Sequence, residues 1–129
     1  MTRINVVPVE ELCDQHLLAE HRELTRIPNA IAKGRYSLDG QPSEYTLGKG
    51  HVKFFYDKLR FLLDRYYNLN NECRKRGFTV EQRWPIRTWP VHLFKDYEPT
   101  EEALRINRER IKDRMNNFKP RWTKNDTTI

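Results

Sequence analysis

The stretch between residues 51 and 76 carries the strongest helical pattern in the chain. Apolar side chains recur at alternating spacings of four and three residues: Phe55, Leu59, Leu62, Tyr66, Leu69 and Cys73, with Phe54, Leu63 and Tyr67 widening the face. Such spacings place side chains on one side of an α-helix. Arg74-Lys75-Arg76 and Gly77 follow, and both cations and glycine are favoured where a helix ends. The pattern predicts a central core helix over 51–76.

Two further segments have helical periodicity. In residues 10–27 the predicted buried stripe is Cys13, Leu17, Leu24 and Ile27, and in residues 100–118 it is Leu104, Ile111, Met115 and Phe118. Pro28 is expected to end the first helix near Ile27, because the residue before a proline disfavours helical geometry. Thr100 is expected to cap the start of the last helix.

These helices predict an all-α fold, a single compact domain over residues 1–129 with three main helices and long connections. A chain of 129 residues suits one modest core. Residues 1–9 are expected to form an extended N-terminal arm, and residues 119–129 a polar C-terminal tail. Prolines between residues 78 and 100 exclude a long helix there, so the aromatic side chains of that segment are expected to fold back onto the core.

Positive charge is concentrated near the C-terminus. The formal net charge is +6, and residues 103–124 hold eight Lys and Arg against two acidic residues. Arg110 and Arg114 lie one turn apart on the predicted helix, as do Arg108 and Lys112. A concentrated basic stretch indicates a polyanionic partner. The alternative is a solvated helix face, which is the commoner meaning of a charge run.

Several classes of protein are disfavoured by composition. Cys13 and Cys73 fall among apolar residues, so buried thiols are expected, and no Cys/His cluster has the spacing of a metal site. No apolar run approaches the roughly 20 residues of a membrane span. The N-terminus lacks the basic and apolar regions of a signal peptide, so a cytoplasmic location is expected.

The N-terminus offers an unusual nucleophile. Thr2 is small, so removal of Met1 would leave a free α-amine whose ordinary pKa is about 8, well below that of lysine. Such an amine can attack an electrophilic carbon and form a Schiff base. Arg22-Glu23-x-x-Arg26 could place an arginine-flanked carboxylate opposite it. Without further information, Glu23 is more simply a solvated helix carboxylate paired with Arg26.

Two long blocks of the sequence resemble the phage pyrimidine-dimer DNA glycosylase/AP lyase family known as endonuclease V. The resemblance is carried by Met1-Thr2-Arg3-Ile4-Asn5, by Glu11-Leu12-Cys13-Asp14-Gln15-His16-Leu17-Leu18-Ala19-Glu20-His21-Arg22-Glu23-Leu24, and by Gly48-Lys49-Gly50-His51-Val52-Lys53-Phe54-Phe55-Tyr56-Asp57-Lys58-Leu59. It is dense over residues 1–27 and 47–78 and thin elsewhere.

The resemblance implies a set of roles. It assigns Thr2 as the amine nucleophile at the sugar C1′ and Glu23 as the carboxylate that stabilises the transition state and assists β-elimination. The other implied site residues are Arg3, Arg22 and Arg26 as phosphate ligands, His16 in the active site, and Arg110 and Arg114, which align with a basic pair on the family's last helix. With Lys112 and Arg121 of the basic stretch, Arg110 and Arg114 are expected to bind DNA. The implied partner is double-stranded damaged DNA, bound by a monomer with no cofactor, metal or membrane.

The C-terminus departs from the family. The family's tail carries aromatic residues after the tryptophan that corresponds to Trp122, whereas this chain has Thr123-Lys124-Asn125-Asp126. We therefore expect the protein to cleave DNA at pyrimidine dimers, but with looser selectivity for this lesion than the family shows. Trp84, Trp89 or Trp122 could replace the missing aromatic residues if one of them contacts the lesion. Two alternatives stay open: the same chemistry on another damaged or modified base, and a non-catalytic helical DNA-binding protein.

Overall fold

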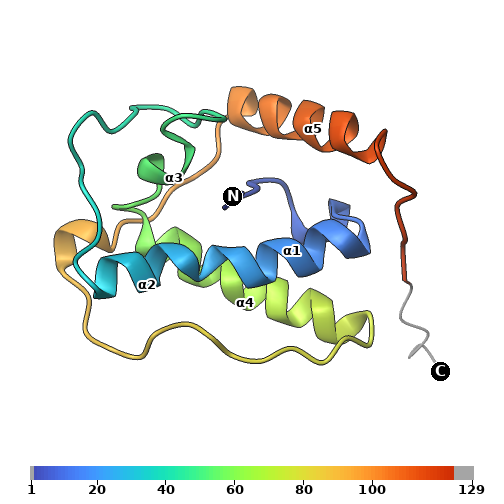
Figure 1. The fold of residues 1–129 in the computed structure, drawn as a ribbon, viewed down its shortest axis with the longest axis horizontal. Coiled ribbons are helices and arrows are strands. Elements are labelled where there is room, and N and C mark those ends of the chain that lie inside the picture. The colour runs from blue at the N-terminus through green and yellow to red at the C-terminus, as the bar shows by residue number, and fades with distance from the viewer. Residues whose placement is uncertain (1, 124–129) are drawn as a thin grey trace.

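The computed structural model describes residues 2–123 and confirms the all-α prediction. The α-helices are α1 (Asp14–Leu24), α2 (Arg26–Ala32), α3 (His51–Phe54), α4 (Leu59–Lys75) and α5 (Glu101–Met115), with short 3-10 helices at η1 (Val9–Glu11) and η2 (Val91–Leu93). Helix α1 packs along α4. In the view of Figure 1, α5 lies above these helices, and the N-terminal arm lies between them and α5. No helix in this part of the chain is long and apolar enough to cross a membrane.

The first predicted helix is divided, and the predicted stop at Pro28 is wrong. Helix α1 ends at Leu24, Thr25 separates the two helices, and α2 continues through Pro28 to Ala32. Pro28 is the third residue of α2. An N–H in the first turn has no acceptor within its helix, so a proline costs little there. The predicted stripe of this segment is confirmed, because Cys13, Leu17, Leu24 and Ile27 are all buried.

The predicted central helix is also divided, into α3 and α4. Between them the backbone of Asp57 accepts a hydrogen bond from Lys95 N at 3.0 Å, and Lys58 forms an isolated bridge with Phe94. A distant segment thus binds the backbone that a continuous helix would use. The stripe from Phe55 to Cys73 is nevertheless buried, although Tyr67 is exposed.

The predicted end of this helix is confirmed. Gly77 has a left-handed backbone with φ of 86°. Gly77 N donates to Arg74 O at 3.0 Å and Phe78 N donates to Cys73 O at 2.8 Å. This pair of bonds is the Schellman motif, which satisfies the last carbonyls of the helix.

Helix α5 begins where predicted but buries a different face. The Thr100 side chain accepts a hydrogen bond from Ala103 N at 3.0 Å. The four apolar residues of the predicted stripe, Leu104, Ile111, Met115 and Phe118, are only partly buried. Ala103 and Asn107 are the buried residues of this helix. The difference arises because α5 packs over the polar backbone of the N-terminal arm.

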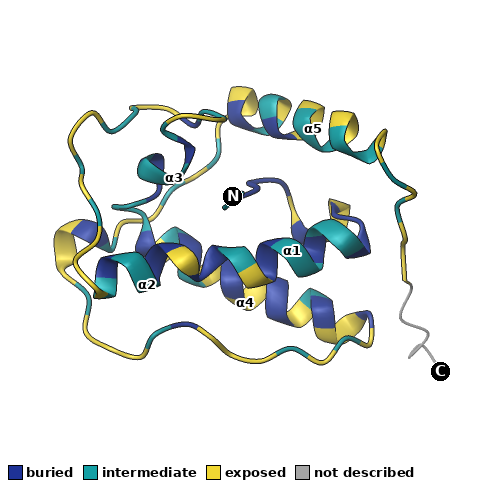
Figure 2. Cartoon of the chain, in the orientation of Figure 1, coloured by how far each residue is buried: buried dark blue, intermediate teal, exposed yellow. Residues whose placement is uncertain are grey.

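The N-terminal arm is an integral part of the core. Figure 2 shows this segment as largely buried, and Ile4, Val6 and Val7 are at most 5% exposed. Ile4 N donates to His51 Nε2 at 2.9 Å, and Ile4 O accepts a hydrogen bond from the Tyr45 hydroxyl at 3.1 Å. The arm therefore has a defined path to its first residues.

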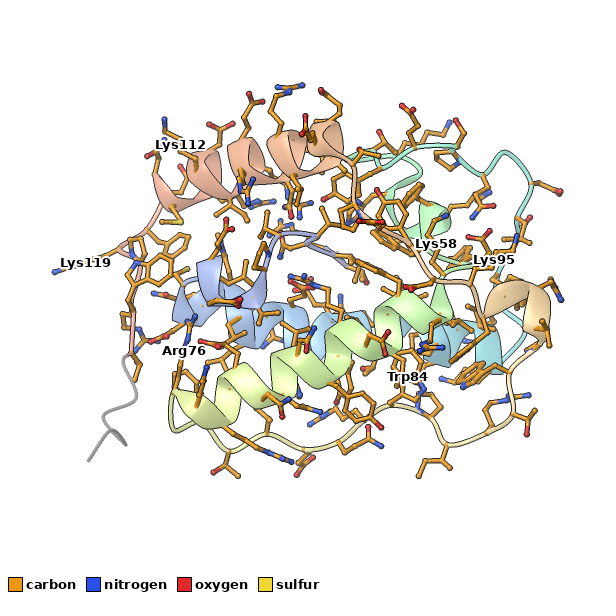
Figure 3. All side chains as sticks on the ribbon, turned by 180° about the vertical axis from the view of Figure 1, so that it is seen from behind. Lys58, Arg76, Trp84, Lys95, Lys112 and Lys119 are labelled. Atoms are coloured by element: carbon orange, nitrogen blue, oxygen red, sulfur yellow. The ribbon has the colours of Figure 1, made fainter. Side chains whose placement is uncertain are left out.

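The segment 119–123 lies against the start of α1. Asp14 N donates to Arg121 O at 2.8 Å, and the Asp14 carboxylate accepts a bond from Thr123 N at 3.1 Å. The guanidinium carbon of Arg76 lies over the Trp122 ring, 5.9 Å from its centroid. Trp84 packs against Tyr66 of α4. Figure 3 shows Trp84 on the loop that follows α4. The remaining tail, residues 124–129, is outside the described residues.

His51 gives this fold a specific pH dependence. Burial lowers the pKa of His51 to about 4, and the charge of Arg110 lowers it further, although the bond from Nδ1 to Thr46 O at 2.8 Å opposes the shift. The neutral ring accepts the Ile4 N–H at Nε2. In the unfolded chain the His51 ring has its ordinary pKa of 6.5 and binds a proton more tightly than in the folded chain. The contribution of neutral His51 to the free energy of unfolding is therefore complete above about pH 6.5 and is lost as the pH falls toward 4.

We expect His51→Gln to remove up to about 3 kcal/mol of the pH-dependent change in unfolding free energy between pH 7 and pH 4. Burial also lowers the pKa values of His16 and His21, so part of the pH dependence should remain. Urea unfolding at a series of pH values measures the change. Exposed His92 is the control, because His92→Gln should leave the curve unaltered. An unaltered curve for His51→Gln would contradict the assigned ring state.

Candidate active site

The arm, α1 and α5 line a small, partly open cavity of about 40 Å³. Its lining residues are Arg3, Asn5, His16, Ala19, Glu20, Glu23, Arg110, Ile111 and Arg114. Five of these residues, Arg3, His16, Glu23, Arg110 and Arg114, were predicted as site residues from sequence. The fold thus brings together groups that are more than 100 positions apart in the chain.

Glu23 meets the start of the arm. Its Oε1 accepts a hydrogen bond from Arg3 N at 3.0 Å, and its Oε2 lies 4.0 Å from Arg22 Nη2. The Arg3 amide nitrogen is bonded to the carbonyl carbon of Thr2. Glu23 therefore fixes the backbone immediately after Thr2, which is itself partly buried.

Three guanidiniums line the cavity together with this carboxylate: those of Arg3, Arg110 and Arg114. Burial lowers the pKa of Arg3, and the nearby charges of Arg114 and Arg110 lower it further, whereas Glu23 raises it. Arg110 is itself partly buried, which lowers its pKa, and its Nη2 donates to Asn5 Oδ1 at 2.9 Å. The cavity is positively charged overall, so it suits an anion such as a DNA phosphate.

His16 contributes a neutral ring to the cavity wall. Burial lowers the pKa of His16, and Arg110, Arg114 and Arg3 lower it further. The ring packs edge-on against Phe118 at 5.3 Å between centroids. Within residues 2–123, its buried Nδ1 has no hydrogen-bond partner. The imidazole therefore has one hydrogen-bonding nitrogen that no described protein group uses.

The other predicted site residues do not line the cavity. Thr2 is partly buried and directly precedes the lining residue Arg3. Arg22, Arg26, Lys112 and Arg121 are exposed. Figure 3 shows Lys112 and Lys119 at the C-terminal end of α5, directed away from the helical body. Two other cations of this helix are neutralised by carboxylates: Arg105 pairs with Glu102 and Glu109, and Arg108 pairs with Glu11. Within the described part of α5, the exposed cation that lies outside these pairs is therefore Lys112, near the C-terminal end of the helix.

A buried ion pair beside the cavity was missed in the sequence. Glu20 is 2% exposed and Arg65 is 6% exposed, and the two form a bidentate pair. Glu20 Oε1 also accepts a bond from Asn5 Nδ2 at 2.7 Å. The signal was present, because Glu20 falls between Leu17 and Leu24 on one apolar stripe and Arg65 between Leu62 and Leu69 on another.

The chain belongs to the pyrimidine dimer DNA glycosylase family, whose family model matches residues 1–86. The matched part contains the arm, Glu23 and most of the cavity, but not α5. The family defines the broad function as removal of a base from damaged DNA during repair, and it implies that the protein binds damaged DNA. This agrees with the resemblance seen in the N-terminal half of the sequence.

Proposed function

We propose that the protein is a bifunctional DNA glycosylase and AP lyase in which the Thr2 α-amine is the nucleophile. The supporting observation is the 3.0 Å hydrogen bond from Arg3 N to Glu23 Oε1, which brings the first residues of the arm to a carboxylate inside a basic cavity. Removal of Met1 is part of the proposal, and Met1 lies outside the described residues.

The amine attacks the sugar C1′, so that an N–C1′ bond forms as the C1′–base bond breaks and the base leaves with the bonding electrons. Opening of the sugar ring then gives an imine. Loss of a C2′ proton expels the 3′ phosphate by β-elimination, and water releases the product from the amine. The cations that line the cavity disfavour a further positive charge, which favours the neutral, nucleophilic amine.

Glu23 is the better of the two cavity carboxylates for this role. Glu20 is held by Arg65 and Asn5, so its charge is already compensated. Glu23 binds the arm through one oxygen only, and its nearest guanidinium, on Arg22, is 4.0 Å from the other. A carboxylate at this point stabilises the positive charge that develops on the sugar and can accept the C2′ proton.

The basic residues of α5 and the tail are proposed to bind the DNA backbone. Arg114 lines the cavity, while Lys112 and Arg121 lie outside it and are exposed. Arg22 and Arg26 are proposed phosphate ligands on the α1–α2 side. Phosphate contacts of this kind make binding sensitive to salt.

We expect Arg114→Ala to weaken binding of damaged and undamaged duplexes alike and to reduce the log–log salt slope by about one unit. Arg105→Ala is the matched control on the same helix, because Glu102 and Glu109 already neutralise that guanidinium. Fluorescence anisotropy at several salt concentrations measures both slopes. Equal slopes for Arg114→Ala and the wild type would exclude a phosphate contact.

The proposed lesion is the cyclobutane pyrimidine dimer, cleaved with looser selectivity than in relatives that have an aromatic tail. Aromatic stacking contributes roughly 1–3 kcal/mol per base, so its loss would reduce discrimination by about one to two orders of magnitude. The test is nicking of ultraviolet-irradiated duplex against a duplex with one abasic site. Cleavage of both is expected. Cleavage of the abasic duplex alone would exclude the dimer, and cleavage of neither would leave a DNA-binding protein.

A further inference from the structure

Side chains, rather than a neighbouring strand, bind the backbone of the N-terminal arm. His51 and Tyr45 hold Ile4 on one side. On the other side, Arg65 Nη1 donates to Val7 O at 2.7 Å. A single extended segment has no regular ladder of its own, so each buried N–H and C=O needs a partner from elsewhere. The path of the arm therefore depends on a few particular side chains.

Asn107 of α5 makes two of these backbone contacts and a third contact with a side chain of the arm. Its Oδ1 accepts hydrogen bonds from Val6 N at 2.6 Å and from Val7 N at 3.1 Å, and its Nδ2 donates to Asn5 Oδ1 at 2.8 Å. Asn107 is 0% exposed, so water cannot replace these bonds without a change in packing. The two N–H donors also fix the orientation of the amide, since only its oxygen can accept them.

The contacts of Asn107 are linked to the cavity. Asn5 Oδ1 also accepts a bond from Arg110, and Asn5 Nδ2 donates to Glu20. Arg110 lies about one turn after Asn107 on α5. The helix that lines one wall of the cavity thus also holds the arm three to five residues after Thr2.

We propose that Asn107 is a positioning residue, which through Val6, Val7 and Asn5 sets where the Thr2 amine lies relative to Glu23. This inference rests on the proposed Schiff-base function. Asn107 does not line the cavity, so it acts on the reaction only through the arm. The proposal extends the catalytic unit beyond the part of the chain that the family model matches, to a residue of α5.

Asn107→Ala tests the proposal by separating chemistry from binding. Displacement of a reacting group by about 1 Å can cost a hundredfold in rate. We expect the single-turnover rate on lesion DNA to fall about a hundredfold, with Kd for that DNA within about threefold of wild type. Asn71→Ala, an exposed asparagine of α4, should behave as wild type. Asn107→Asp keeps an oxygen that can accept the two N–H groups. Its single-turnover rate should therefore be at least tenfold higher than that of Asn107→Ala.

Amide hydrogen exchange gives a readout that does not depend on catalysis. In Asn107→Ala the amides of Val6 and Val7 should exchange at least tenfold faster, while those of Leu62 and Leu69 in α4 stay protected. If Asn107→Ala does not fold, Asn107→Ser carries the same comparison, because its shorter side chain cannot reach both amides. Faster exchange with a wild-type reaction rate would overturn the positioning role, and so would an unaltered exchange rate.

Failure of the positioning role and failure of the proposed function are distinguishable. If wild-type protein forms no borohydride-trapped adduct at residue 2, the Schiff-base function fails and the positioning of that amine fails with it. If wild-type protein forms the adduct and Asn107→Ala forms it at the same rate, only the positioning role is overturned.

Discussion

Replacement of Glu23 by glutamine should abolish base removal while DNA binding persists. Glutamine keeps the shape of the side chain, and its Oε1 can still accept the Arg3 N–H that Glu23 binds at 3.0 Å. Only the negative charge is lost. Since removal of one preorganised electrostatic group costs about 10²–10³ in rate, and Glu23 is proposed to act in both steps, we expect at least a thousandfold loss on lesion DNA.

Binding should be retained or become tighter in Glu23→Gln, because the carboxylate repels phosphate. Single-turnover nicking of a duplex with one pyrimidine dimer, beside anisotropy on the same duplex, measures both quantities. Glu44→Gln is the control, since Glu44 is an exposed loop carboxylate. Wild-type turnover by Glu23→Gln would remove Glu23 from the mechanism.

Insertion of one glycine immediately before Thr2 should have a similarly large effect. The added residue moves the terminal amine by up to about 3.8 Å, whereas the bond from Arg3 N to Glu23 holds the rest of the arm in place. A reacting amine displaced that far loses its alignment with C1′, so we expect strand cleavage to fall by three orders of magnitude or more.

The control for this insertion is one glycine added after Gly40, in an exposed turn. That insertion should leave cleavage unaltered. Melting curves should show that both proteins are folded. A chain with an extra residue before Thr2 that still cuts damaged DNA at the wild-type rate would mean that the nucleophile lies elsewhere.

The elements that could be predicted from sequence are those set by local periodicity. The stripe from Phe55 to Cys73 is buried as predicted, and Thr100 and Gly77 lie at helix ends as predicted, because caps and amphipathic faces depend on neighbours along the chain. Pro28 shows the limit of local rules. A proline ends a helix in the interior but is tolerated in the first turn, and the break at Thr25 determines which case applies.

The candidate site could be predicted in part. Arg3, His16 and Glu23 were named from the sequence, and they line one cavity because they lie on the arm and on one side of α1; their roles stay predictions. The role of Asn107 could not be predicted, because a polar residue in a charged helix has no distinctive sequence pattern. Its role depends on contact with the N-terminal arm, about 100 positions away in the chain. For the same reason, sequence could not show that Arg110 lies against Asn5 and not on the outer face of α5.

The central claim is that the α-amine of Thr2 forms the covalent intermediate, and borohydride trapping tests it most directly. The wild-type protein is incubated with a dimer-containing duplex and borohydride, which reduces the imine to a stable amine. Peptide mass spectrometry then locates the cross-link. The adduct is expected on residue 2 of protein that has lost Met1. An adduct on a lysine, or no adduct while the strand is cut, would contradict the mechanism.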